Sequence, residues 1–208
     1  PGVPGGMLRP HGNGIRCEEQ HQNVTITDCI FTNGYSSRSE GIRIEYFENP
    51  EIIISNCQVQ NVNNYGICAS LHDPDDLEGR RVSITDCEVM NCGKGISASI
   101  RNGELIIDNC TIRDCAEWGI AAFIRNGELI IDNCTVSDCE ENGVSLGTYN
   151  SQLRFTNNDV FNTVEEAVYL SGSGDDENSE IIIRNNRLHH CRGGFWTNRF
   201  NNDGNNTT

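Results

Sequence analysis

The chain has 208 residues, of which 15 are Lys or Arg and 30 are Asp or Glu, so its formal net charge at pH 7 is −15. Such an acidic protein repels the phosphate backbone, because nucleic-acid binding needs clustered basic residues that displace counterions. We therefore expect no nucleic-acid partner. No run of residues reaches the roughly 18 to 20 apolar residues that cross a bilayer, so the sequence predicts no membrane span.

Residues 1–13 form a Pro- and Gly-rich opening that we interpret as a linker or the start of a cap. Internal repeats follow it. Residues 101–111 and 125–135 share the identical stretch RNGELIIDNCT, 24 residues apart, and weaker copies cover nearly the whole chain. The repeated units begin at a Gly-Ile-like pair, with starts at Gly14, Gly41, Gly66, Gly95, Gly119, Gly143, Ala167 and Gly194. The spacing of 24 to 29 residues gives about seven complete units.

Each unit contains two further columns of mostly small residues. The first column follows an apolar residue by three places and holds Cys29, Cys57, Cys87, Cys110, Cys134, Asn158 and Asn186. The second column lies five places later and holds Gly34, Val62, Cys92, Cys115, Cys139, Thr163 and Cys191. Nine of the eleven cysteines therefore occupy two structural ladders.

The local pattern within the units alternates, as in the Gly-Ile-Ala-Ala stretch at 119–122, and shows no sustained helical period. The chain contains 22 Ile against 9 Leu, and β-branched side chains suit a pleated strand better than a helix. Short strands are predicted in every unit, with the Gly+1 and Gly+3 positions facing inward and the Gly+2 and Gly+4 positions facing outward.

The repeated units resemble those of the pectate-lyase-like superfamily of right-handed parallel β-helix proteins, over residues 14–198. The resemblance implies an all-β fold, a single-stranded right-handed parallel β-helix of about seven complete coils of 24–29 residues. Residues 199–208 then form a polar C-terminal tail or a truncated continuation. A leucine-rich repeat is disfavoured because its helical convex segment is missing, and a left-handed hexapeptide helix because its coils are shorter.

In such a stack, equivalent residues of neighbouring coils lie about 4.8 Å apart. Inward Asn side chains can pair with each other or with backbone groups, and inward Cys acts as a compact hydrophobe. We expect buried, reduced thiols, because parallel side chains keep their Cβ atoms too far apart for a disulfide. Cys68, at an outward Gly+2 position, is the thiol expected to be most reactive.

Enzymes of the resembled superfamily cleave or epimerise acidic polysaccharides, and several use Ca²⁺ with an Arg or Lys as base. The resemblance makes Arg43 the candidate base, with Arg16, Glu18 and Glu45 beside it on one outward face. A salt-bridge ladder on the surface explains the same residues. The catalytic clusters of the polygalacturonase-like and alginate-epimerase branches are missing from the sequence.

Two acidic insertions supply oxygen ligands that suit Ca²⁺, although acidic turns have the same composition. The metal candidates are Asp73, Asp75, Asp76, Asp175 and Asp176. Outward aromatic rings offer flat apolar surfaces to sugars. Tyr169 and Trp196 occupy equivalent outward positions in successive coils and are the candidate ligand-binding residues.

The sequence favours a non-catalytic, extracellular or surface-associated β-helix rod for structural display, adhesion or glycan contact, for instance in a viral or cellular appendage. A polysaccharide lyase or epimerase acting on acidic glycans with Ca²⁺ is one alternative, and an engineered or consensus-like scaffold is another. The expected partners are a polysaccharide or surface glycan, and further copies of the chain stacked end to end or a larger parent chain.

Overall fold

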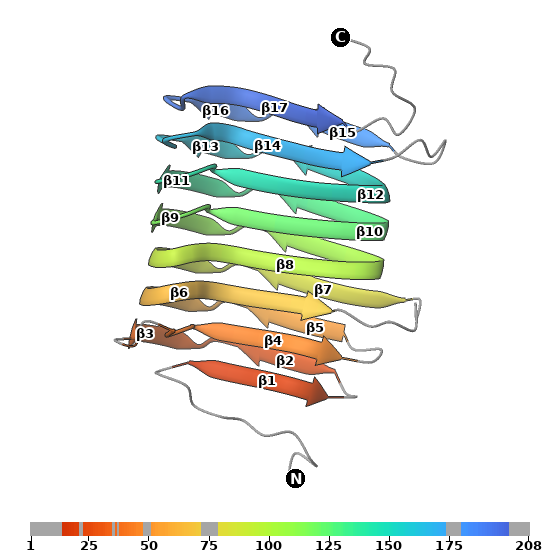
Figure 1. Ribbon diagram of the computed structural model, residues 1–208. Coiled ribbons are helices and arrows are strands. Elements are labelled where there is room, and N and C mark those ends of the chain that lie inside the picture. The colour runs from red at the N-terminus through yellow and green to blue at the C-terminus, as the bar shows by residue number, and fades with distance from the viewer. Residues whose placement is uncertain are drawn as a thin grey trace.

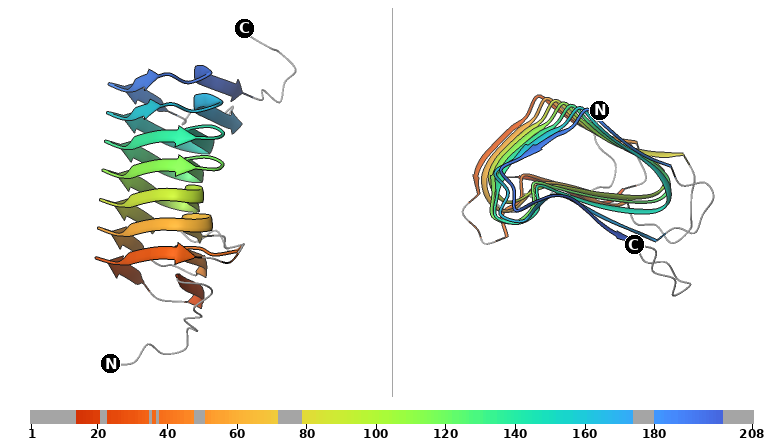
Figure 2. Two further views of the ribbon diagram at one scale, coloured as in Figure 1. Left: turned by 90° about the vertical axis from the view of Figure 1, so that its left-hand side faces the viewer. Right: turned by 90° about the horizontal axis from the view of Figure 1, so that it is seen from above.

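The computed structural model describes residues 14–20, 23–34, 36, 38–47, 51–71, 79–173 and 180–199. Throughout this part of the chain the regular structure is β-strand, and each strand pairs in parallel with strands of neighbouring coils (Figure 1). The strands stack into a β-solenoid of about seven turns. Seen along the stack, successive coils superpose closely (Figure 2). The prediction of an all-β parallel β-helix is confirmed.

Three strand-lined faces run along the stack. Face A contains β1 (Ile15–Gln20), β4 (Ile42–Phe47), β14 (Glu166–Ser173) and β17 (Gly193–Arg199). Four long strands turn corners of the coil and add segments to more than one face, and all four contribute to face A. They are β6 (Gln58–Leu71), β8 (Glu88–Asp108), β10 (Ile120–Asp132) and β12 (Val144–Thr156).

Face B follows face A along the chain and contains the later parts of β8, β10 and β12. Its separate strands are β2 (Val24–Thr27), β5 (Glu51–Ser55), β7 (Arg80–Thr85) and β15 (Ile181–Arg184). Face C includes the early parts of β6 and β8. Its separate strands are β3 (Ile30–Gly34), β9 (Thr111–Cys115), β11 (Thr135–Cys139), β13 (Asp159–Phe161) and β16 (Arg187–His189).

The repeat period sets the register of the stack. Ile120 of β10 pairs with Ile96 on one side and with Val144 on the other, so the repeated sequence columns become stacks of like residues. In the middle coils the inward columns are buried and mostly aliphatic. A Cβ on Gly119 would lie 2.3 Å from Val136 Cγ1 and 2.8 Å from the Gly143 carbonyl oxygen, so this tight corner requires glycine.

The cysteine columns lie in the interior. Cys57, Cys87, Cys110 and Cys134 are buried in the first column, and all eleven cysteines are free thiols. The Cys134 thiol donates to the carbonyl oxygens of Asp132 at 3.2 Å and, one coil earlier, of Ile107 at 3.6 Å. Burial raises the pKa of the Cys57 and Cys92 thiols to about 11. These thiols are therefore protonated at neutral pH.

Asn and Asp residues turn the corners of the coils, a role that the sequence analysis did not assign. Among the residues that the structure describes, seventeen other than glycine adopt a positive φ, and all of these are Asn or Asp except His190. Asn and Asp tolerate this left-handed conformation better than other side chains. Their amides also bond from coil to coil, as between Asn133 and Asn109 and between Asn126 and Asn102, each at 2.9 Å.

Candidate functional site

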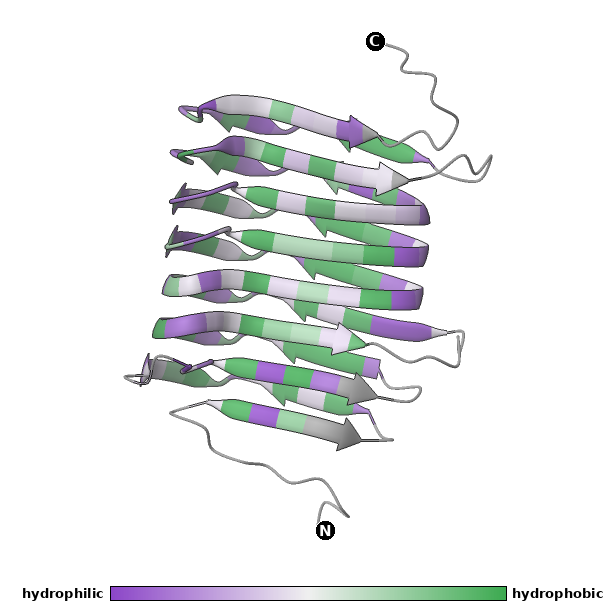
Figure 3. Ribbon diagram, viewed as in Figure 1, coloured by the Kyte–Doolittle hydropathy of each residue, from purple (hydrophilic) through white to green (hydrophobic). Residues whose placement is uncertain are grey.

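One outward column of face A changes in size along the stack. The register places these residues one above another: Arg16, Arg43, Cys68, Ser97, Ala121, Ser145, Tyr169 and Trp196. The ends of the column carry large side chains and its middle carries small ones. At about 4.8 Å per coil, the stretch from Cys68 to Tyr169 spans roughly 19 Å. Figure 3 shows the change as purple bands on β4 that give way to green and white ones on β8, β10 and β12.

The small residues leave a hollow on face A, here called the groove, with a volume of about 320 Å³. Its lining includes five serines, from strands β6, β8, β12 and β14, and one aromatic side chain from β10. The lining residues are Ser70, Ser97, Ala98, Ser99, Ala121, Ala122, Phe123, Ser145, Leu146, Gly147 and Ser171. The groove therefore combines a hydroxyl-rich floor with apolar surface.

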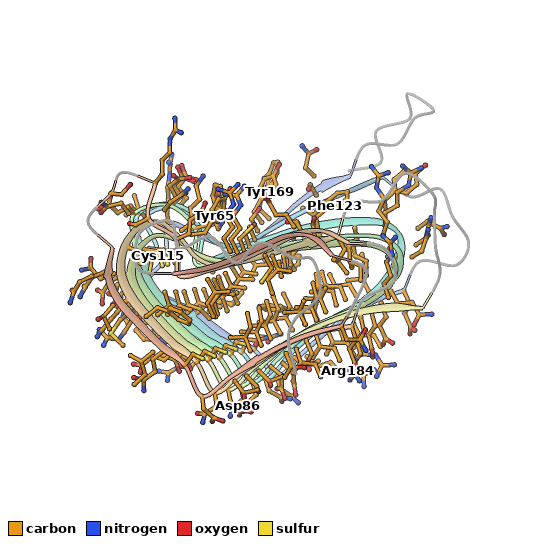
Figure 4. All side chains as sticks on the ribbon, turned by 90° about the horizontal axis from the view of Figure 1, so that it is seen from below. Tyr65, Asp86, Cys115, Phe123, Tyr169 and Arg184 are labelled. Carbon is orange, nitrogen blue, oxygen red and sulfur yellow. The ribbon has the colours of Figure 1, made fainter. Side chains whose placement is uncertain are left out.

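Phe123 forms an aromatic element beside this floor and is 46% exposed. A Cβ on Gly147 would lie 2.4 Å from Phe123 Cδ2, so the ring rests directly over that glycine of the next coil. Figure 4 shows Tyr65, Phe123 and Tyr169 projecting from the same face of the coils. The missing side chain at Gly147 thus lets the Phe123 ring lie along the groove.

A stacked aromatic pair marks the C-terminal end of the groove. The rings of Tyr169 and Trp196 have centroids 4.8 Å apart and an interplanar angle of 20°. Trp196 is 44% exposed. The two predicted ligand-binding residues are therefore side by side, directly after Ser145 in the same outward column.

A charged cluster marks the N-terminal end. Arg43 donates to Glu45 at 2.6 Å and also forms an ion pair with Glu40. Burial alone would lower the pKa of Arg43, but the hydrogen bonds to Glu45 and Glu40 outweigh it and raise the pKa above its ordinary value. Arg43 is therefore held as a protonated guanidinium, which opposes its use as a general base. Arg16 and Glu18 pair in register with Arg43 and Glu45, while the Glu18 side chain is outside the described part of the chain.

The same cluster covers Cys68, and this corrects the expectation of a reactive thiol. Cys68 lies one coil beyond Arg43 and is only 4% exposed. Burial raises the pKa of its thiol to about 11. Because the thiolate is the reactive form, the buried Cys68 thiol is inert at neutral pH.

A cation–aromatic cluster stands on the side of face A nearest face C. Lys94, the only lysine of the chain, has its Nζ 4.9 Å from the Tyr65 ring centroid and 4.8 Å from the Trp118 centroid. Its ammonium group also lies 3.4 Å from a carboxylate oxygen of Glu117. Tyr65, Lys94 and Trp118 each directly precede the glycine of a Gly-Ile pair. The sequence pattern did not identify this column as outward-facing.

The five predicted metal ligands, Asp73, Asp75, Asp76, Asp175 and Asp176, lie outside the described residues. Within the described ranges no group of three or more His, Cys, Asp or Glu side chains is arranged to hold a metal ion. The described chain also contains no helix of the length and apolar character that crossing a membrane requires.

A family model for the right-handed β-helix region matches residues 54–208. The chain belongs to the right-handed β-helix family. This membership gives the hand of the coils, which completes the predicted fold. No curated protein is significantly similar in sequence to this β-helix protein. The family assignment concerns the fold, and fold alone does not determine function.

Proposed function

We propose that this β-helix protein is a non-catalytic rod that binds a glycan chain in the groove of face A. The observation that carries the proposal is the combination of a serine-lined floor with exposed aromatic rings beside it and at its end. Serine hydroxyls both donate and accept hydrogen bonds, as sugar hydroxyls do. Aromatic rings provide flat apolar surface for the faces of the sugars.

The direction of the groove suits a linear chain. The register repeats the floor serines from one strand to the next, as with Ser70 and Ser99. Over roughly 19 Å the ligand would meet serine hydroxyls on four of the five coils and the Phe123 ring on the coil between them. A short oligosaccharide lying parallel to the stack axis can use this repetition, with its terminal ring over the Tyr169 and Trp196 pair.

The charges of face A favour an uncharged glycan over an acidic one. Arg43 is paired with Glu40 and Glu45, and Lys94 with Glu117. A uronate would have to displace a carboxylate from one of these cations, against a formal net charge of −15. For the same reason, Arg43 supports the superfamily's lyase chemistry poorly.

Glycan binding is tested with an array of uncharged and acidic oligosaccharides, followed by titration of the best binder. Phe123→Ala and Trp196→Ala should each weaken binding about two- to twelvefold, since an aromatic contact contributes about 0.5–1.5 kcal/mol. Ile30→Ala is the matched control, because Ile30 is an exposed apolar residue on face C. Equal binding by all four proteins would place the ligand elsewhere. No binding to any glycan would refute the proposal.

The enzymatic alternative has its own assay. The protein is incubated with uronic-acid polysaccharides and Ca²⁺, and unsaturated product is followed by ultraviolet absorbance, with NMR of the polymer to detect epimerisation. The proposal predicts neither reaction. Product that Arg43→Ala abolishes would establish a lyase or epimerase instead.

A second candidate property, end-to-end association with another copy, rests on the last coil. Ile181 is 44% exposed there, although its column partner Leu153 is fully buried one coil earlier. Residues 180–199 carry four arginines and one glutamate, while residues 14–40 carry four acidic residues and two arginines. Opposite charge at the two ends favours head-to-tail contact. Sedimentation velocity should show self-association that Ile181→Ser weakens, whereas a strictly monomeric protein at every concentration and salt would refute it.

A further inference from the structure

Two neighbouring histidines lie on the last coil of face C, away from the groove. His189 ends strand β16, and its ring stacks on Phe161 of the preceding coil with centroids 5.0 Å apart and an interplanar angle of 6°. His190 follows at the corner with a φ of 57°. The six preceding coils have Asn or Asp at this corner, as at Asn162. The His189 ring and the His190 backbone are thus held by regular features of the stack.

The imidazole nitrogens of the pair converge. His189 Nδ1 and His190 Nδ1 are 2.7 Å apart, so the two nitrogens share one proton. On the other side of the His189 ring, Nε2 lies 3.1 Å from Asp159 Oδ1. If Nε2 donates its proton to Asp159, His189 Nδ1 presents a lone pair toward His190. This tautomer is the one that a metal ligand needs.

We propose that His189 and His190 chelate a divalent first-row transition metal through their two Nδ1 atoms. The metal would take the place of the shared proton, with His189 held by Asp159 and Phe161 while the exposed His190 ring turns until its Nδ1 lone pair also points at the metal. Metal–imidazole bonds of about 2.05 Å across a 2.7 Å separation give an N–metal–N angle of about 82°. This angle is closer to the 90° of a tetragonal site than to a tetrahedral angle, and tetragonal nitrogen sites suit Cu²⁺ or Ni²⁺.

Asp159 acts as a positioning residue in this site. A carboxylate bonded to the second nitrogen of a metal-binding imidazole fixes the ring and its tautomer, and its loss typically weakens metal binding 10- to 100-fold. The neighbouring thiol contributes no ligand, because Cys191 Sγ donates to the carbonyl oxygens of Val160 and His189. Two protein nitrogens and water would therefore form the inner coordination sphere.

The test titrates the full chain with Cu²⁺ alone, using calorimetry for affinity and electron paramagnetic resonance for the ligands. His190→Asn is the matched variant, because the corner of the preceding coil is Asn162 at the same positive φ. The wild type should show splitting from two imidazole nitrogens, and His190→Asn should bind at least about tenfold more weakly with splitting from one. Asp159→Asn should keep two nitrogens but weaken binding about tenfold or more.

Thermal unfolding separates metal binding from stability. Without metal, His190→Asn should unfold within a degree or two of the wild type, and Cu²⁺ should raise the midpoint of the wild type more than that of the variant. Identical affinity and spectra for the wild type and His190→Asn would overturn the proposal, because Cu²⁺ would then be bound by the other histidines. Tighter binding of Zn²⁺ than of Cu²⁺ would overturn the assigned geometry.

Discussion

Replacing Asn158 tests why the inward ladder contains both Cys and Asn. The residue is 2% exposed, and its side chain bonds to the backbone of the preceding coil. Its Nδ2 donates to the Ile131 carbonyl at 3.0 Å, and its Oδ1 accepts from the Cys134 amide at 2.9 Å. Asn158→Ala would leave both backbone groups buried without these partners. At about 1–3 kcal/mol for each unsatisfied group, the free energy of unfolding should fall by about 2–6 kcal/mol.

Asn158→Cys is the matched variant, because the ladder contains Cys in the preceding coil. There the Cys134 thiol donates to the Ile107 carbonyl at 3.6 Å, and a Cys at 158 could donate to Ile131 in the same way. We therefore expect Asn158→Cys to cost about half as much as Asn158→Ala. Both costs are measured by urea unfolding under reducing conditions, followed by circular dichroism.

Two outcomes would refute this reasoning. An Ala variant within about 0.5 kcal/mol of the wild type would show that the backbone groups find other partners, such as water. Equal stability of the Ala and Cys variants would show that side-chain volume, and not hydrogen bonding, determines which residues fit the ladder.

Three further predictions concern stability. Gly95→Ala should lower the free energy of unfolding, measured by urea denaturation, by about 1–3 kcal/mol, because its Cβ would lie 2.1 Å from the Gly119 carbonyl oxygen. Gly194→Ala, in the same column, is the control and should be neutral, because its Cβ would meet nothing within 4 Å. Burial and the neighbouring Asp132 raise the pKa of Asp108, so ionisation of this carboxyl group destabilises the fold at neutral pH. Asp108→Asn should therefore raise the melting temperature at pH 7, and this gain should disappear below pH 3.8. A gain that persists below pH 3.8 would contradict the assignment. Burial raises the pKa of the Cys92 thiol from 9.0 to about 11, so the protein should lose about 3 kcal/mol of stabilisation as the pH rises through this interval. Cys92→Ala should therefore show a shallower alkaline loss in pH-dependent unfolding.

The sequence was sufficient to predict the coil stack because one period fixes both the strands and their register. The inward positions of Cys110 and Ile120, for example, follow from their place relative to the Gly-Ile pairs. The left-handed conformation of the corner residues could not be predicted from the repeat pattern alone. Asn109 and Asn133 precede cysteines in the repeated text, but their left-handed φ angles appear only in the structure. The Asn-Cys and Asp-Cys pairs in five units were the available signal.

The groove was harder to predict, because it depends on side chains from neighbouring columns. Alternation correctly placed Cys68 on an outward position, but it could not show that the cluster around Arg43 covers the thiol. Similarly, Glu40 lies just before a Gly-Ile pair, and its ion pair with Arg43 depends on the turn between faces C and A. Exposure on a strand is therefore set by the adjacent columns as well as by the alternating pattern.

The most direct test of the proposed function is a glycan-array measurement comparing the wild type, Ile30→Ala and the double variant with Phe123→Ala and Trp196→Ala. The account predicts that the wild type and Ile30→Ala retain the same uncharged oligosaccharides. It predicts that the double variant, although folded by circular dichroism, loses them. Retention of the same glycans by the double variant, or no retention by any of the three proteins, would contradict the account.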